Sequence, residues 1–369
     1  MTGRERLHNI INKVPVDRIS WTTLVDDVTR SVMPRPVRAM APFDFYRHIG
    51  CDILQFGNYG LPKSLRMIPP CQLITPNIET NSYMTADGQQ VTERKTDRGT
   101  LIAVSKNAHP VKYPVESLDE LERLKDIWLN SYYQETPDME ESYERVDAEI
   151  GDSGIYVPTI DPSPIQQLIE FEMGIANFYY LLQDYPKEMA ELFEVMHACR
   201  LREYRIFASR IRSEAIILTE NTSSTLTSPS VYAKYSLPQI RDYVEAIHQC
   251  GKKTILHMCG LLEDLLPLIK ETGLDGINGL TPPPFGDTRF EDALDMFGED
   301  FVILGGVFNE EVFQKAQVSS EEIKAALDEI FTPRIRKANL VLWLVADGLP
   351  TSLERFQAVQ EWMMEIGEK

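Results

Sequence analysis

Three stretches of the sequence place side chains that can bind a metal or move a proton at the end of an apolar run. Glu220 ends one run, His257 and Cys259 follow a second, and Asp347 follows a third. Imidazole, thiolate and carboxylate groups are the ligands that zinc takes in proteins. Carboxylates placed in this way can also act as acid and base. Glu220, His257, Cys259 and Asp347 are therefore the candidate site residues.

Each candidate also has an ordinary structural interpretation. A lone His and a lone Cys near a strand end are more often packed or hydrogen-bonded than metal-bound. Glu220 could cap the helix after it, and Asp347, which precedes Gly348, could start a turn. Glu220 follows a buried run directly, so its carboxylate needs a partner to offset its desolvation. Convergence of the four side chains in the fold would favour a functional role.

The elements that must position these side chains follow a rhythm of strands and helices from about residue 150. Continuous apolar runs alternate with helical stretches, which is typical of parallel strands covered on both faces. One helix is expected over 261–270, with Gly273 as its C-terminal cap. The count of runs predicts a TIM (β/α)8 barrel, with a doubly wound open sheet as the alternative. The runs cover residues 19–21, 52–56, 155–160, 215–218, 254–256, 276–278, 301–304 and 340–345.

The remaining sequence departs from that rhythm. Residues 4–15 have the pattern of an amphipathic helix stopped by a proline. Residues 60–115 are rich in proline and in short β-prone pieces, which predicts an inserted excursion built on hairpins. Ser117 and Glu120 form a capping-box pattern at the start of a helix. We expect one barrel domain over residues 1–369, with the excursion inserted in it.

Charge and composition exclude several classes of function. Asp and Glu number 56 against 37 Lys and Arg, a formal net charge of −19, which would repel phosphate backbones and anionic lipids. We therefore expect no nucleic-acid or membrane partner. The sequence shows no signal peptide and no apolar run near the ~20 residues of a membrane span, so a cytoplasmic protein is expected. The five cysteines are scattered and odd in number, which indicates reduced thiols.

Several short segments resemble a known family, and the resemblance covers nearly the whole chain. They are Arg4-Glu5-Arg6, Pro15-Val16-Asp17-Arg18, Thr96-Asp97-Arg98-Gly99-Thr100-Leu101, Thr254 to Gly260, Glu271 to Asn278 and Gly305-Gly306-Val307. Together they are similar to the uroporphyrinogen decarboxylase superfamily. Within it, the His-x-Cys-Gly segment at 257–260 resembles the branch of zinc-dependent, cobalamin-linked methyltransferases. That branch includes methylcobamide:coenzyme M methyltransferase and corrinoid-dependent O-demethylases of anaerobic metabolism. The resemblance implies a TIM barrel.

Two departures from the family pattern matter. The decarboxylases hold substrate carboxylates with an early Arg-Gln-Ala-Gly-Arg motif, whereas the matching stretch here, 21–27, ends in Asp26-Asp27. Porphyrinogen decarboxylation is therefore not expected. The methyltransferases take a further zinc ligand from a cysteine in a Gly-Cys-Gly-Ile-Pro-like turn. Asp347 stands at that position here. The resemblance thus implies a zinc site of His257 and Cys259 completed by Asp347 or Glu220.

The activity implied by the resemblance is methyl transfer between a small methylated compound and the cobalamin of a corrinoid protein. A methoxylated aromatic or another O- or S-methyl compound is the expected donor, and Glu220 and Asp347 are the expected catalytic residues. Cobalamin would be supplied by the partner corrinoid protein, since this chain lacks the Asp-x-His-x-x-Gly signature of a cobalamin-carrying domain.

Three alternatives stay open at the level of sequence. The first is a metal-free decarboxylase that uses Glu220 and Asp347 as acid and base, with Arg289 or Arg98 holding a carboxylate. The second is the reverse methyl transfer, from the corrinoid to a thiol. The third is a non-catalytic barrel that binds a ligand or the corrinoid protein.

Overall fold

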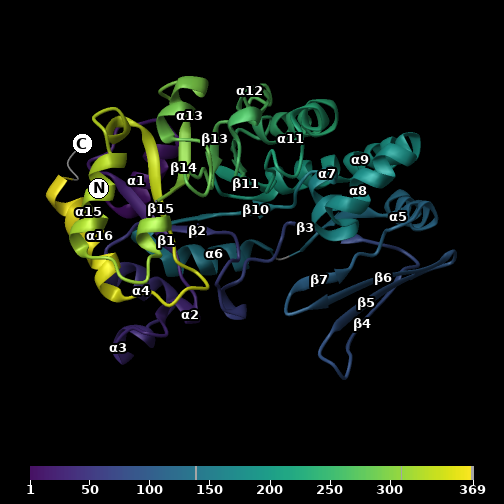
Figure 1. The fold of residues 1–369 in the computed structure, drawn as a ribbon, viewed down its shortest axis with the longest axis horizontal. Coiled ribbons are helices and arrows are strands. Elements are labelled where there is room, and N and C mark those ends of the chain that lie inside the picture. The colour runs from purple at the N-terminus through teal and green to yellow at the C-terminus, as the bar shows by residue number, and fades with distance from the viewer. Residues whose placement is uncertain (138, 309, 367–369) are drawn as a thin grey trace.

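The computed structural model describes residues 1–137, 139–308 and 310–366. Its centre is a barrel of eight parallel strand positions with helices packed around it (Figure 1). All eight positions overlap the predicted apolar runs, because strands that are buried on both faces are apolar throughout. The strands are β1 (Ser20–Leu24), β2 (Ile53–Phe56), β9 with β10 (Gly154–Val157 and Thr159–Ile160), β11 (Ala215–Thr219), β12 (Lys253–His257), β13 (Gly276–Asn278), β14 (Val302–Val307) and β15 (Asn339–Val345).

Hydrogen bonds between the strands close the ring. Seven strands pair in parallel in the order β1, β15, β14, β13, β12, β11 and β10, and β2 pairs in parallel with β9. Pro158, which has no N–H to donate, separates β9 from β10, and its carbonyl still accepts from the Ile217 N–H at 2.9 Å. The Asp52 N–H donates to the Trp21 carbonyl at 3.0 Å beside β1 and β2. The predicted TIM barrel is confirmed, and the doubly wound alternative is wrong.

Helices cover the outside of the barrel and the excursions between its strands. The N-terminal helix ends at Ile11, before its predicted end at residue 15. The α-helices are α1 (Gly3–Ile11), α2 (Asp27–Arg30), α3 (Arg35–Arg38), α4 (Pro42–Ile49), α5 (Leu118–Asn130), α6 (Met139–Ile150), α7 (Pro164–Gln167), α8 (Gly174–Asp184), α9 (Pro186–Arg210), α10 (Pro229–Val231), α11 (Leu237–His248), α12 (Leu266–Lys270), α13 (Phe290–Phe297), α14 (Glu310–Phe313), α15 (Ser320–Ile330) and α16 (Leu353–Ile366). Two π-helical turns, η3 (Leu168–Glu172) and η4 (Tyr232–Ser236), and four 3-10 turns, η1 (Lys63–Leu65), η2 (Gly151–Ser153), η5 (Glu263–Leu265) and η6 (Ile335–Lys337), complete the set that the described residues form.

The helix expected over 261–270 is shorter than predicted. A 3-10 turn occupies Glu263–Leu265, and the α-helix begins only at Leu266. Pro267 lies in the first turn of α12, where its missing N–H costs no helical hydrogen bond. The N–H groups of Leu262 and Glu263 donate instead to Asp287 Oδ1, at 2.7 and 3.1 Å. A side chain from the loop between β13 and α13 therefore replaces the first helical turn.

An antiparallel meander lies beside the barrel, at the lower right of Figure 1. It consists of β4 (Glu79–Met84), β5 (Gln90–Thr96), β6 (Gly99–Lys106) and β7 (His109–Lys112), while β3 (Cys71–Ile74) pairs with β8 (Tyr132–Glu135). Leu101 of the meander is fully buried, and Arg94 forms an ion pair with Glu172 of η3. These contacts fix the meander against η3. Ser117 accepts from the Glu120 N–H at the start of α5, as the capping pattern predicts.

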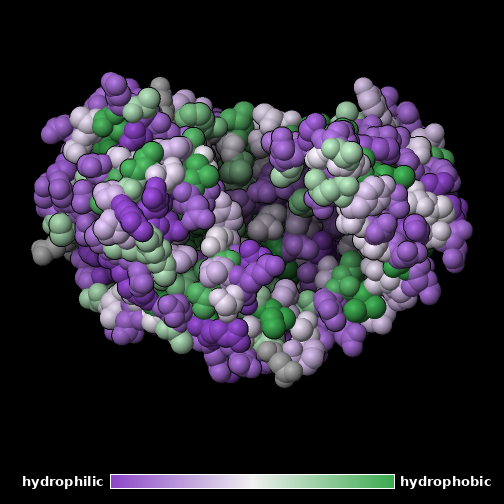
Figure 2. All heavy atoms as spheres, turned by 90° about the horizontal axis from the view of Figure 1, so that it is seen from below, coloured by the Kyte–Doolittle hydropathy of each residue, from purple (hydrophilic) through white to green (hydrophobic). Residues whose placement is uncertain are grey.

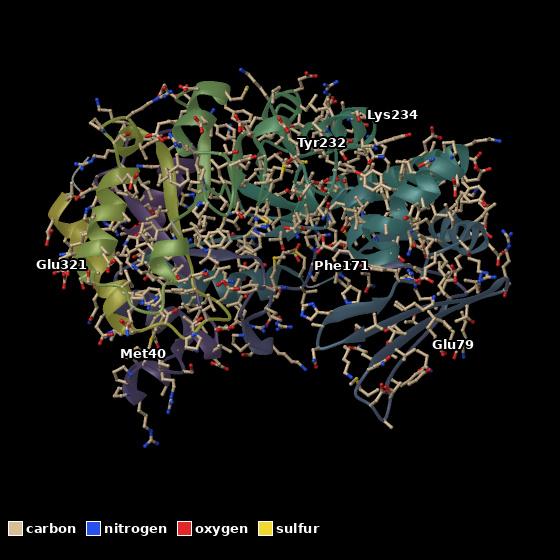
Figure 3. All side chains as sticks on the ribbon, viewed as in Figure 1. Met40, Glu79, Phe171, Tyr232, Lys234 and Glu321 are labelled. Carbon is tan, nitrogen blue, oxygen red and sulfur yellow. The ribbon has the colours of Figure 1, made fainter. Side chains whose placement is uncertain are left out.

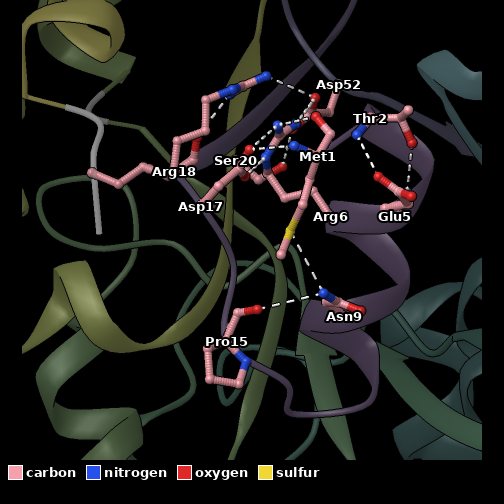
Figure 4. Close-up of polar contacts among 11 residues, drawn as sticks. Met1, Thr2, Glu5, Arg6, Asn9, Pro15, Asp17, Arg18, Ser20 and Asp52 are labelled. Atoms are coloured by element: carbon pink, nitrogen blue, oxygen red, sulfur yellow. Dashed lines mark hydrogen bonds and ion pairs between the residues drawn. The ribbon is translucent and has the colours of Figure 1, made fainter.

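A buried ion-pair network holds the amino end of the barrel (Figure 4). Asp52 precedes β2 and is 3% exposed. Its carboxylate accepts from Arg6 at 2.6 Å, Arg18 at 2.9 Å and the Ser20 hydroxyl at 2.7 Å. Three donors offset the desolvation of one carboxylate. In a TIM barrel this end serves stability, so chemistry is expected at the opposite rim. Within the described ranges, no helix has both the length and the apolar character that a bilayer crossing requires.

Candidate functional site

The predicted site residues lie at the carboxyl ends of their strands. Glu220 directly follows β11, His257 is the last residue of β12, and Asp347 lies two residues beyond β15. Thr219 is paired with His257 across the ladder, and the Asn221 N–H donates to the His257 carbonyl at 2.9 Å. Because the strands are parallel, all of these ends lie on one rim.

Glu220 is a buried carboxyl group held by neutral donors. Only 1% of the residue is exposed. Its oxygens accept from the Ser163 N–H at 2.9 Å and the Ser163 hydroxyl at 2.6 Å, and the Thr222 hydroxyl lies at 3.4 Å. Ser163 is itself the N-cap of α7. Glu220 therefore binds the cap of another helix and does not cap the segment that follows it.

This environment changes the protonation of Glu220. Burial raises the pKa of the carboxyl group to about 7, because desolvation disfavours the anion more than the hydrogen bonds from Ser163 and Thr222 favour it. A carboxyl group with such a pKa is partly protonated at neutral pH. Glu220 can therefore donate a proton where an exposed glutamate could not.

A cavity of about 640 Å³ lies between the meander and η3, and its lining reaches the residues beside Glu220. Gln166 accepts weakly from Thr222, at 3.4 Å, and Asn221 has a left-handed backbone with φ 45°. Figure 2 shows the face of the molecule deeply hollowed between its two lobes, and Figure 3 places Phe171 between α8 and β7. The lining includes Thr92, Lys112, Gln166, Ile169, Phe171 and Asn221.

His257 is oriented by Asn278 on the neighbouring strand. Asn278 Nδ2 donates to the Leu304 carbonyl, so Asn278 Oδ1 faces His257 Nδ1 at 2.5 Å and accepts its proton. Two glycines make room for this pair: a Cβ at Gly279 would meet the His257 ring at 3.0 Å, and one at Gly305 would meet the Asn278 amide at 2.4 Å. The hydrogen bond leaves the lone pair on His257 Nε2.

Aromatic rings surround the His257 imidazole. The Phe56 ring centroid lies 5.3 Å away and that of Trp343 6.3 Å away, and Phe56 and Trp343 stack with centroids 6.2 Å apart. Burial lowers the pKa of His257, since the imidazolium form is desolvated there. His257 is therefore neutral at pH 7 and able to accept a proton or bind a cation.

Asp347 and Tyr59 form a second hydrogen-bonded pair on the rim. Its Oδ2 accepts the Tyr59 hydroxyl at 2.6 Å, while the Gly348 N–H donates to Asp26. Asp347 Oδ1 is buried and has no hydrogen-bond partner within the described residues. Burial and the neighbouring Asp347 carboxylate together raise the pKa of Tyr59. Asp347 therefore does more than start a turn.

The four candidates do not assemble a complete metal site. His257 has a free Nε2, Cys259 is exposed two residues later, and Asp347 has a free oxygen, while both oxygens of Glu220 are occupied. Across residues 1–137, 139–308 and 310–366, however, no group of three or more His, Cys, Asp or Glu side chains lies close enough to hold one ion. The side-chain positions thus supply separate ligands but no closed tetrahedral set.

The arginines of the decarboxylase alternative do not contact the two candidate carboxylates. Arg98 lies at the meander turn and forms an ion pair with Asp126. Arg289 precedes α13 and lines a different cavity, together with Phe290 and Glu329. Neither guanidinium forms a hydrogen bond with Glu220 or Asp347 among the described contacts.

Sequence reasoning missed the residues that hold the candidates in place. Ser163 lies in a proline-flanked segment after β10, and Asn278 ends β13 between Ile277 and Gly279. Ser163 follows a predicted strand and Asn278 is the last residue of one, so the strand-end argument that found Glu220 applied to them as well. Tyr59, three residues beyond β2, could have been found in the same way.

The closed parallel barrel, with a protonatable acid and a neutral imidazole on its carboxyl rim, defines a TIM-barrel protein with the rim layout of barrel enzymes. A family model described as uroporphyrinogen decarboxylase (URO-D) matches residues 106–340, and the chain belongs to this family. A solved methyltransferase from Methanosarcina mazei has a similar fold, with a TM-score of 0.58, 14% identity and 99% of each chain covered.

A weaker likeness is to D-psicose 3-epimerase in the presence of D-fructose, with a TM-score of 0.34, 10% identity and coverage of 61% of this chain and 72% of that one. No curated protein matches the sequence.

Proposed function

We propose that the protein transfers a methyl group from a small methylated compound, such as a methoxylated aromatic, to the cobalamin of a partner corrinoid protein. The observation that carries this proposal is Glu220, a buried acid with a pKa of about 7, whose neighbour Asn221 lines a cavity of about 640 Å³. A likeness in fold to the Methanosarcina mazei methyltransferase adds support. Demethylation of an ether needs such an acid, because the oxygen that loses the methyl group becomes anionic.

In the proposed reaction the methyl group moves to cobalt and a proton moves to the departing oxygen. The electron pair of the reduced cobalt in the partner forms a bond to the methyl carbon, and the carbon–oxygen bond breaks with its pair on oxygen. The proton of Glu220 passes to that oxygen. The products are a methylcobalamin, an alcohol or phenol, and the Glu220 carboxylate, which solvent then reprotonates. The acid stabilises charge that appears mainly in the transition state.

The cavity wall supports an uncharged ring as the body of the donor. Phe171 and Ile169 contribute apolar surface from η3, and residues of β5 and β6 line the cavity from the meander. The two charged side chains of the wall have partners: Lys112 lies 3.7 Å from the carboxylate of Glu116, and Glu170 accepts from Gln166 at 3.2 Å. The one cation of the lining is paired with a carboxylate, whereas Glu170 keeps its negative charge, so the slot disfavours an anionic donor and accommodates an uncharged aryl ether.

We further propose that zinc binds at His257 and Cys259, with solvent or substrate in its remaining positions, since no third His, Cys, Asp or Glu side chain of the described residues lies close enough to join them. Zinc would polarise the heteroatom that loses the methyl group. The imidazole supports this, since Asn278 accepts the hydrogen bond from its Nδ1 and leaves Nε2 as the ligand atom, as hydrogen-bond acceptors behind ligating histidines do in metal sites.

The activity is tested with wild-type protein, a corrinoid protein carrying reduced cobalamin, and a panel of O-, S- and N-methyl compounds. We expect methylcobalamin, seen in the visible spectrum of the corrinoid, with the aryl methyl ethers. Release of carbon dioxide from a carboxylated substrate with no methylcobalamin from any donor would establish the decarboxylase instead. Methylation of a thiol by methylcobalamin alone would establish the reverse direction.

A further prediction concerns the cavity between the meander and η3, where we propose that the methyl donor binds. Phe171→Ala removes an apolar wall, so the KM for the aryl ether should rise ~5- to 10-fold, while kcat changes little because ground state and transition state lose the same contact. Tyr180→Ala, an exposed residue on α8 outside the cavity lining, is the matched control. Steady-state kinetics checks both, and an unchanged KM in Phe171→Ala would place the donor elsewhere.

A further inference from the structure

One part of the rim has a charge opposite to that of the whole protein. The chain carries a formal net charge of −19. Residues 28–69 instead carry six basic residues against two acidic ones. The basic residues are Arg30, Arg35, Arg38, Arg47, Lys63 and Arg66, and the acidic ones are Asp44 and Asp52. Such a local reversal of sign creates a distinct electrostatic surface.

Four of these cations, which we call the basic rim, are exposed and have no acidic partner. Arg35, Arg38, Lys63 and Arg66 form no ion pair with any residue in the described part of the chain. Most other cations around the barrel differ, as Arg334 does in pairing with both Asp295 and Glu299. The basic rim therefore carries positive charges that no carboxylate of the described residues neutralises by an ion pair.

The basic rim is fixed to the carboxyl end of the barrel. Arg35 and Arg38 lie on α3, after β1, and Lys63 and Arg66 lie in and beside η1, after β2. Buried side chains anchor these segments: Met33 and Val37 hold the first, and Met67 holds the second. In Figure 1, α3 projects away from the barrel, and Figure 3 shows Met40 at the base of this projection.

Exposed apolar side chains accompany the cations. Val28 is 46% exposed, Val32 59% and Ile68 44%. Arginines interleaved with apolar groups are typical of protein–protein interfaces. A surface that bound only an extended polyanion would not need these apolar groups, and the remaining negative charge of the protein opposes nucleic acid and anionic lipid.

We propose that the basic rim is the docking surface for an acidic partner protein, which is the corrinoid protein of the proposed function. This identity rests on that function, because the methyl acceptor must approach the rim that carries Glu220 and His257. Opposite charges on the two proteins accelerate their encounter and fix their orientation, while the exposed valines add apolar contact once water is displaced.

The test is charge reversal in the full-length chain, as Arg35→Glu with Arg38→Glu. With a corrinoid protein carrying reduced cobalamin as acceptor, the KM for that protein should rise ~10-fold or more, with a weaker dependence on salt. Methyl transfer to free reduced cobalamin should stay unchanged. The control is Lys187→Glu with Arg241→Glu, which makes the same change in net charge on α9 and α11.

Binding of the corrinoid protein to immobilised enzyme separates the two proposals. Loss of binding in the rim variant alone supports the docking surface, even where no methyl transfer is seen and the proposed function fails. Equal binding by the rim variant, the control and the wild type overturns the docking surface, even where methyl transfer proceeds. The docking surface is also overturned if the wild type binds duplex DNA or anionic vesicles, and the rim variant loses this binding but still binds the corrinoid protein.

Discussion

Glu220→Gln is expected to lower the rate of methylcobalamin formation from an aryl methyl ether by ~100-fold or more, with a much smaller change in donor affinity. The amide has the shape of the acid but no proton to give to the departing oxygen. Ser163 and Thr222 can still bond to it, so the cavity beside it should keep its form. The rate is measured from the visible spectrum of the corrinoid, and donor affinity from its concentration dependence.

The pH profile gives this prediction a second readout. The pKa of Glu220 is raised to about 7 by burial, so the acid form is present below pH 7 and is lost as the pH rises through that value. The wild-type rate should therefore fall above pH 7. The Glu220→Gln variant should lose this fall, because an amide does not titrate in that range.

Glu321→Gln is the matched control, since Glu321 is an exposed carboxylate at the start of α15, far from Phe171 of the cavity lining in Figure 3. It should retain the wild-type rate and pH profile. A Glu220→Gln enzyme with nearly full activity would remove Glu220 as the proton donor. A lower kcat that is accompanied by a lower melting temperature of the variant would indicate a structural role only.

The strands of the barrel could be predicted from sequence because their burial leaves a direct mark on composition. The run at 340–345, for example, is apolar at every position, since β15 is covered on both faces. The helix at 261–270 was predicted less well. The N–H groups at its start donate to Asp287, a residue of the loop between β13 and α13, and helical periodicity carries no information about such a competitor.

The candidate site was predictable in position but not in its contacts. The parallel fold alone places Glu220, His257 and Asp347 on one rim. The partner of Glu220, by contrast, is Ser163, which lies 57 residues away in the chain, and the partner of His257 is Asn278, 21 residues away. Those pairings depend on strand register and side-chain rotamers. The same dependence explains why no group of three or more ligand side chains converges within the described residues.

Cys259→Ala is expected to abolish stoichiometric zinc and to lower methylcobalamin formation by ~100-fold or more, with a smaller effect on donor affinity. Cys259 is exposed on the rim, two residues beyond an imidazole whose Nε2 lone pair is free. A thiolate and an imidazole are strong zinc ligands, and a polarising ion acts mainly on the charge that develops as the methyl group leaves. The wild type is purified without chelator, and its zinc content is measured by elemental analysis.

Cys250→Ala is the control for the loss of an exposed thiol, since Cys250 follows α11 and precedes β12, at the end of the barrel opposite the rim. It should keep both zinc and activity. Stoichiometric zinc that persists in the double variant His257→Ala, Cys259→Ala would place the ion elsewhere. A wild type that is active without any metal, together with an inactive Glu220→Gln, would leave the reaction to the acid alone. Proton donation would then suffice for the departing oxygen, and the two rim ligands would have no part in the chemistry.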